Sequence, residues 1–144
     1  MTTEDELAAL TAAFLDAVSF EPGERPAYDT IRDLFIPQGL LIKNIGSPEI
    51  ATVDEFIAPR QALFDSGELT EFEERELAFV NEVFGNVAHR MSTYSKAGVQ
   101  RGVRFEARGV ISTQFVFTPS GWRMSSMAWD DERPGLVMPD RYEP

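Results

Sequence analysis

The stretch that decides the fold runs from Phe84 to Trp129 and reads FGNVAHRMSTYSKAGVQRGVRFEARGVISTQFVFTPSGWRMSSMAW. It is rich in β-branched and aromatic residues, and turn signals at Gly85-Asn86 and Pro119-Ser120-Gly121 interrupt it. The pattern predicts three antiparallel strands in hairpin order. Apolar side chains fall on both faces of the segment 110–117, so we expect both faces of this sheet to be covered.

The part of the chain before this stretch has mainly helical spacing, with apolar residues recurring at three- and four-residue steps. The segment 39–46 is different, because a short apolar run between glycines is typical of a buried strand. Residues 68–84 fit a helix nearly as well as a strand, and spacing alone does not decide between them. Helices are predicted at about 3–20, 28–35 and 52–67, the last beginning with the capping box of Thr52 and Glu55.

The composition predicts one acidic domain. The 144 residues carry 13 Lys and Arg against 24 Asp and Glu, which gives a formal charge of -11, and 43% of them are hydrophobic. A chain of this length buries an ordinary core without disulfides or a structural metal. We therefore expect a single domain over 1–144, with an irregular, proline-rich tail over 133–144.

Composition and motifs also exclude several classes of function. Cysteine is absent, which removes thiol chemistry, and the negative charge argues against a nucleic-acid partner. No apolar run is long enough for a membrane span, and the acidic N-terminus is unlike a signal peptide, so we predict a cytoplasmic protein. No phosphate loop or metal motif appears, and consecutive carboxylates at 130–132 point alternately to opposite sides, so we expect neither cofactor nor metal.

Four motifs carry a resemblance to a known superfamily: Phe84–His89 running into Ser92-Thr93-Tyr94, Arg108-Gly109, Gly121–Met124, and Trp129–Glu132. Together they resemble bacterial proteins of the nuclear transport factor 2-like (NTF2-like) superfamily. Its members include SnoaL-like polyketide cyclases, scytalone dehydratase, limonene epoxide hydrolase and ketosteroid isomerase. The resemblance implies an α+β, cone-shaped fold with N-terminal helices packed on a strongly curved antiparallel sheet.

The resemblance has three further implications. Residues 71–83 should form a strand that pairs with 87–96 through the Gly85-Asn86 turn. The cone should hold a pocket for a small-molecule ligand. The outer face of the sheet should pair with a second copy of the chain, because a large exposed apolar face is otherwise a liability.

His89, Tyr94 and Asp16 are the candidate catalytic residues. His89 is the only side chain that titrates near neutrality when unperturbed, and it could act as a general acid or base. Resemblance to scytalone dehydratase implies that Asp16 orients it from the first helix. Tyr94 lies five residues beyond His89, so alternation puts the two on opposite faces. The alternative for His89 and Asp16, favoured for the histidine, is an ordinary packed or solvated position.

Arg90, Arg108, Gln114 and Trp129 are the candidate ligand-binding residues. Arg90 shares a strand face with Tyr94, and together they resemble a polar lining for a ligand oxygen. Gln114 lies between apolar neighbours, and a buried amide needs partners or a ligand. The alternative for the arginines, including Arg108, is charge pairing with the acidic segment 68–76, and for Trp129 it is core packing.

Two functions follow from these residues and the resemblance. The first is a small-molecule-binding protein, either alone or with cofactor-free acid/base chemistry of the cyclase, isomerase or dehydratase type on a small apolar substrate. The ketosteroid isomerase mechanism is disfavoured, because the strand at 39–46 has no carboxylate. The second is a non-catalytic dimeric binding or association module, and the sequence leaves open whether the protein is an enzyme.

Overall fold

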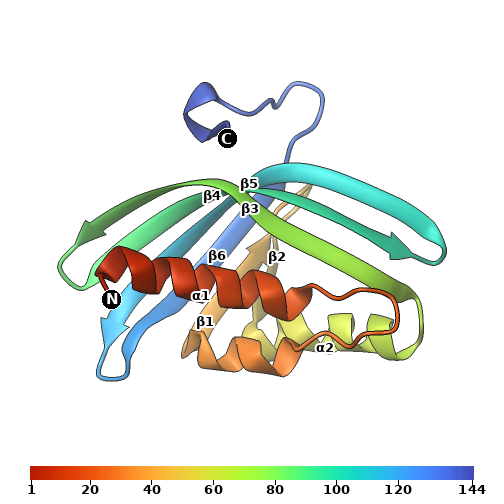
Figure 1. Cartoon of the computed structure of the whole chain (residues 1–144), viewed down its shortest axis with the longest axis horizontal. Helices are drawn as coiled ribbons and strands as arrows, with labels where there is room; N and C mark the ends of the chain where they lie inside the picture. Colours follow the sequence, from red (N-terminus) through yellow and green to blue (C-terminus); the bar gives the residue numbers. More distant parts are fainter.

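A strongly curved sheet carries two helices on its concave side and the C-terminal tail on its convex side (Figure 1). This computed structural model describes residues 1–144. The elements in chain order are α1 (Thr3–Val18), the 3-10 helix η1 (Tyr28–Asp33), β1 (Phe35–Lys43), β2 (Glu49–Thr52), α2 (Val53–Asp65), β3 (Leu69–Phe84), β4 (Val87–Gln100), β5 (Val103–Thr118), β6 (Gly121–Asp131) and the 3-10 helix η2 (Asp140–Tyr142).

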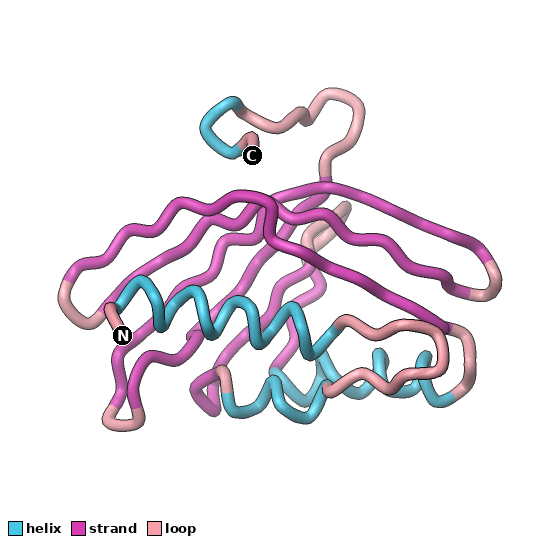
Figure 2. Tube along the Cα trace, viewed as in Figure 1, coloured by secondary structure: helices cyan, strands magenta, loops and turns pink.

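The sheet has six strands in the order β2-β1-β6-β5-β4-β3. The long strands β3 to β6 form consecutive antiparallel hairpins, and they arch over the helices (Figure 2). The α+β class and the cone-shaped curved sheet predicted from the sequence are confirmed. The sheet is mixed rather than wholly antiparallel, because β1 returns parallel to β6.

Local sequence explains where the helices begin. Thr2 caps α1 and exchanges hydrogen bonds with Asp5, whereas Thr52 caps α2 and exchanges them with Glu55. The apolar faces of both helices then pack on the concave side of the sheet. Phe14 of α1 meets the rings of Phe35 and Phe56 within a core cluster of 19 buried residues.

The residues that fit either a helix or a strand belong to β3, which pairs along its length with β4. Local spacing did not decide between helix and strand, and the pairing with β4 does. The strand that the resemblance implied at 71–83 is confirmed. Strand β1 begins earlier than expected, at Phe35, and its register shifts before Leu40, which accommodates Pro37 within the strand. The short strand β2 was not predicted.

One irregularity in the β3–β4 hairpin changes which side chains face the helices. From the turn to the middle of the strands the pairing is regular, and Ala78 faces Thr93. Beyond Leu77 the register shifts by one, so that Glu76 faces Tyr94. Such a bulge moves the following residues of one strand to the opposite face, and it places Glu74 on the concave side.

The tail beyond β6 is irregular, as expected, and it lies against the convex face. The Thr93 hydroxyl donates to the Tyr142 carbonyl at 2.5 Å, and the Met138 amide donates to the Glu132 carboxylate at 3.0 Å. Arg108 bridges Glu132 and Glu143. The tail therefore covers part of β4.

None of the helices combines the length and apolarity that a membrane span requires.

Candidate functional site

A cavity of about 590 Å³ lies inside the cone, between α1, α2 and the concave face of the sheet. Its size falls in the range of small-molecule sites. Most of its wall is apolar, and charged side chains enter it from several elements. The lining residues that bear on its chemistry are Phe14, Tyr28, Lys43, Glu49, Phe56, Arg60, Glu74, Lys96, Ala107, Ile111, Met127, Trp129 and Asp131.

Glu74 on β3 is the carboxylate whose chemistry the cavity changes most. It faces Lys96 in the strand register, and its backbone amide donates to the Ser19 hydroxyl at 3.1 Å. Burial raises the pKa of Glu74 to about 7, and the negative charge of Asp131 adds to this, while the positive charges of Lys96 and Arg60 oppose it. A carboxyl group with this pKa can exchange a proton near neutral pH.

A hydrogen-bonded network of three side chains lies next to Glu74. The Lys96 ammonium forms an ion pair with Asp131 at 3.0 Å, and the Tyr94 hydroxyl donates to the same carboxylate. Tyr94 is fully buried, and its hydroxyl also lies 3.0 Å from the Asp130 carbonyl oxygen. Burial raises the pKa of Tyr94, and the hydrogen bond to Asp131 raises it further, so the phenol stays protonated.

Gly109 makes room for this network. It faces Tyr94 on one neighbouring strand and Asp131 on the other. A Cβ atom at this position would lie 2.6 Å from Tyr94 Cζ, and closer still to the Tyr94 hydroxyl and the Asp130 carbonyl oxygen. Only glycine lets the phenol cross β5 to reach Asp131.

Arg60 on α2 enters the cavity from the helical side. Its guanidinium carbon lies 3.6 Å from the centre of the Phe56 ring, and Nη1 donates to the Phe56 carbonyl at 3.0 Å. Burial lowers the pKa of Arg60, against the opposing effects of Tyr28, Glu74 and Glu49. Burial also raises the pKa of Tyr28. The cavity thus contains a half-buried cation whose only side-chain hydrogen bond is to its own helix.

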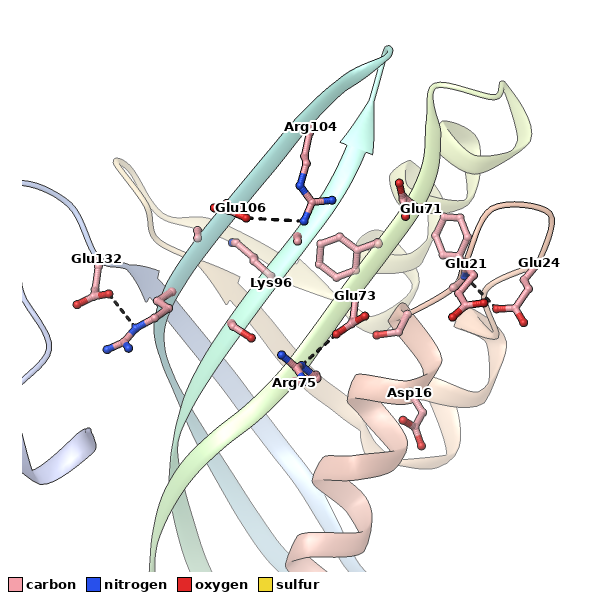
Figure 3. Close-up of a pocket in the computed structure, with 17 residues that line it drawn as sticks. Asp16, Glu21, Glu24, Glu71, Glu73, Arg75, Lys96, Arg104, Glu106 and Glu132 are labelled. Atoms are coloured by element: carbon pink, nitrogen blue, oxygen red, sulfur yellow. Dashed lines mark hydrogen bonds and ion pairs between the residues drawn. The ribbon is translucent and has the colours of Figure 1, made fainter. Parts of the chain in front are cut away.

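A second hollow of about 850 Å³ lies along the outside of β3 and is more open and more polar (Figure 3). Asp16, Glu21 and Glu24 border it from α1 and the following loop (Figure 3). Its arginines already have partners, because Arg75 pairs with Glu73 at 3.0 Å, Arg104 with Glu106 at 3.7 Å, and Arg108 with Glu132 at 3.1 Å. The outer hollow is therefore a solvated surface whose arginines are paired with neighbouring glutamates. The cone cavity is the stronger candidate site.

Two of the residues proposed from the sequence lie at or beside the cone cavity. Trp129 lines it, and Tyr94 supports Asp131 from beneath its wall. Asp16 is exposed at the outer hollow and His89 lies on the convex face, where Nε2 is 2.8 Å from Glu82. As alternation predicts, His89 and Tyr94 are on opposite faces.

The remaining three candidates also lie outside the cavity. Arg90 is on the concave face, but it forms a buried ion pair with Glu76 at 2.6 Å. Gln114 is exposed and faces His89 across the strands of the convex side. Arg108 holds the C-terminal tail through Glu132 and Glu143. The structure therefore does not bring these residues together with Tyr94 and Trp129.

Sequence reasoning missed the charged residues that do converge: Glu74, Lys96, Asp131 and Arg60. Glu74 is one of several glutamates in the acidic segment 68–76, so nothing in the sequence distinguishes it. Asp131 belongs to the row of carboxylates at 130–132, which the sequence predicts to be solvated. Alternation along β6 does separate Asp130 from Asp131, and it turns Asp131 inward together with Trp129. The available signal for Arg60 was its four-residue spacing from Phe56 on a predicted helix.

Comparison with known proteins identifies the fold. An NTF2-like superfamily protein from Salmonella enterica serovar Typhimurium superposes with a TM-score of 0.75 at 15% identity, covering 91% of this chain and 92% of that one. An NTF2-like protein with a cystatin-like fold from Novosphingobium aromaticivorans gives 0.69 at 15% identity, covering 94% and 89%. The chain therefore has the NTF2-like fold.

A third similar structure is described as a putative calcium/calmodulin dependent protein kinase II association domain, from Xanthomonas campestris. Its TM-score is 0.66 at 13% identity, with 88% of this chain and 86% of that chain covered. No family model and no curated protein matches the sequence. At these identities the likeness shows the fold alone and assigns no activity or partner.

Proposed function

We propose that this protein binds a small organic molecule in the cone cavity and transfers a proton on it without a cofactor. The observation that carries the proposal is a largely apolar cavity of about 590 Å³ in which the Glu74 carboxyl group, with a pKa of about 7, faces Lys96. An apolar wall with few convergent polar groups is typical of ligand sites, and a perturbed carboxyl group there is a candidate acid or base.

The proposed chemistry assigns different roles to the charged groups. Ionised Glu74 accepts a proton from a carbon next to a substrate carbonyl and returns it elsewhere, which is an isomerisation. The Lys96 ammonium stabilises the negative oxygen that forms in between. Tyr94 and Asp131 are positioning residues, because they hold the ammonium at 3.0 Å from the Asp131 carboxylate.

Ligand binding is tested with N-phenyl-1-naphthylamine, an uncharged dye that fluoresces in apolar sites. We expect saturable binding of about one molecule per chain. Ala107→Trp fills the cavity and should abolish binding, whereas Ala97→Trp puts the same ring on the opposite face of the sheet and should leave it unchanged. Equal binding by the wild type and Ala107→Trp would place the dye elsewhere and refute the proposed site.

Proton transfer is tested with 1-tetralone in deuterated water. We expect the protein to accelerate deuterium exchange at the carbon next to the carbonyl, measured by nuclear magnetic resonance. Glu74→Gln should lose at least about a hundredfold of that acceleration, because general bases contribute about 10² to 10⁴ in rate. If the dye binds but Glu74→Gln exchanges as fast as the wild type, the protein binds ligands without this chemistry.

We also propose that the chain forms a homodimer through the convex face of β1, β2, β5 and β6, outside the part of β4 and β5 that the tail contacts through Thr93 and Arg108. Ile50 and Leu40 are exposed there, and Ile42 faces Ile50 across the strands. Light scattering should give the mass of a dimer. Ile50→Glu should give a monomer, and Val103→Glu, which charges a similarly exposed apolar position at the start of β5, should not. The cytoplasmic location remains a prediction from the sequence.

A further inference from the structure

Arg60 is a half-buried cation that has no ion-pair partner in the chain. Each of the ion pairs in the structure involves other residues, and Arg60 takes part in none of them. Its single hydrogen bond is to the Phe56 carbonyl of its own helix at 3.0 Å. A guanidinium has five N–H donors, so most of its capacity to bind an oxygen acceptor is unused.

The position of Arg60 makes this unused capacity relevant to a ligand. The side chain lines the cone cavity, and stacking on the Phe56 ring at 3.6 Å holds the guanidinium plane in place. The other arginine of the concave face shows the contrast, because Arg90 donates to both oxygens of Glu76 at 2.6 and 2.9 Å. Arg60 has no such partner, so an incoming anion could make the charge-assisted hydrogen bonds that Arg90 already makes within the chain.

The charges around the cavity leave Arg60 available. Lys96 is neutralised by Asp131 at 3.0 Å. Glu74 faces Lys96 across the strands, and Glu49 is exposed at the start of β2. Both raise the pKa of Arg60, but neither forms an ion pair with it. Lys43, the third cation of the lining, also lacks an ion-pair partner. The lining also carries the four carboxylates Glu49, Glu74, Glu106 and Asp131, none of which forms an ion pair with Arg60 or Lys43.

We infer that the ligand of the cone cavity carries a carboxylate on its apolar body, and that Arg60 binds this carboxylate through its free N–H groups. The inference rests on the proposed function, since it names the class of molecule that occupies that site. The guanidinium and a carboxylate match in geometry and form two parallel hydrogen bonds. The apolar body then lies among Phe14, Ile111, Met127 and Trp129, within reach of Glu74.

The test is displacement of bound N-phenyl-1-naphthylamine by a matched pair of competitors at pH 6. Naphthalene-2-carboxylate is an anion at this pH, and naphthalene-2-carboxamide has the same shape without the charge. We expect the carboxylate to bind at least about tenfold more tightly, because hydrogen bonds between charged groups are stronger than those of a neutral amide. Equal affinities of the two competitors in the wild type would overturn the inference.

The variant Arg60→Gln tests whether Arg60 is the residue that causes the preference for the carboxylate. In this variant the preference should fall to less than about twofold, while the neutral dye, which also reports that the pocket is folded, still binds. Arg25→Gln is the matched control and should keep the full preference, because Arg25 also stacks on a phenylalanine, at 5.3 Å from Phe64, but lies outside the cavity.

Two other outcomes would contradict the inference. If the preference for the carboxylate survives in Arg60→Gln and disappears in Lys43→Gln, then Lys43 and not Arg60 binds the anion. Failure of the wild type to bind the dye would refute the proposed function, and the inference with it. Dye binding without a preference for the carboxylate would refute only the inference.

Discussion

Strand β4 carries two charged clusters on the same concave face, and they differ in how their charges are satisfied. Toward one end, Arg90 lies between Glu76, Asn81 and Phe79, and its side chain is only 2% exposed. The Ser92 hydroxyl donates to the same Glu76 carboxylate at 2.6 Å. Toward the other end, Lys96 faces Glu74 and pairs with Asp131 at the wall of the cavity.

The difference separates a structural charge cluster from a site. Every polar group around Arg90 has a partner within the chain, so this cluster fixes how β3 and β4 meet and leaves nothing for a ligand. In the cavity cluster, Glu74 is raised in pKa to about 7 and Arg60 lacks a counter-ion. A carboxyl group with a perturbed pKa and a cation without an ion-pair partner, both lining one cavity, are the features that point to function.

The largest effect is expected from Arg90→Met, which removes one partner of the buried pair. The Glu76 charge is then left buried and uncompensated, so we expect a loss of about 3 to 5 kcal/mol in the free energy of unfolding. Urea denaturation measures it. The folded fraction should still bind N-phenyl-1-naphthylamine as the wild type does, because Arg90 is outside the cavity.

Two variants control this prediction. The double variant Arg90→Met with Glu76→Met replaces the whole pair by apolar side chains and should recover most of the lost stability. Arg32→Met removes exposed ion pairs with Asp29 and Asp54 and should cost less than about 1 kcal/mol. If Arg90→Met costs no more than Arg32→Met, the cluster is not the structural anchor that its contacts indicate.

A somewhat smaller effect is expected from Gly109→Ala at the cavity cluster. The added methyl group would overlap the Tyr94 ring and the Asp130 carbonyl oxygen, so either the phenol or the strand must move. We expect a loss of about 3 kcal/mol, at the upper end of the usual cost of overpacking. Thermal unfolding measures it, and the Tyr94–Asp131 hydrogen bond should be lost with it.

Gly46→Ala is the matched control for this substitution. A Cβ atom at Gly46 would meet no atom within 4 Å, and its backbone does not lie in the left-handed region. Its stability should therefore stay within about 0.5 kcal/mol of the wild type. Equal stabilities of the two alanine variants would mean that β5 does not hold Tyr94 as closely as the geometry indicates.

The same two clusters explain which parts of the molecule could be predicted from sequence. The hairpins β4–β5 and β5–β6 follow from turn residues and β-branched runs, and the covered faces of the sheet follow from apolar side chains on both faces of β5. Strand β3 and the cone shape were implied only by the resemblance to the NTF2-like superfamily. Turn signals set a regular register at Gly85-Asn86, which would put Glu74 opposite Ala97 on the convex face. The bulge at Leu77 puts it opposite Lys96 instead.

The position of Glu74 in the cavity therefore depends on the bulge in β3, which no local pattern in the sequence indicates. A bulge changes the register by one residue, and the residues around Leu77 carry no glycine that would suggest it. Gly98 likewise lies within β4, where a Cβ atom would meet Phe105 Cζ at 2.6 Å. Close approach of side chains across strands, like the bulge, becomes visible only when the sheet is assembled.

The smallest effect, and the one most specific to the cavity cluster, is expected from Glu74→Gln. The folded state raises the pKa of Glu74 from 4.5 to about 7, so between these values the folded protein holds a proton that the unfolded chain releases. The contribution to stability is complete below about pH 4.5 and is lost as the pH rises through 7. We expect a change of about 2 kcal/mol after allowance for solvent screening.

Denaturation at pH 5 and pH 8 tests this sign. Glutamine cannot ionise, so the variant should lose less stability between these pH values than the wild type and should be the more stable protein at pH 8. Glu73→Gln, which removes an exposed carboxylate from the same strand, should follow the wild type. Parallel pH profiles for the wild type and Glu74→Gln would mean that Glu74 is as hydrated as its neighbour, and the contrast between a satisfied cluster and a reactive one would then fail at its central residue.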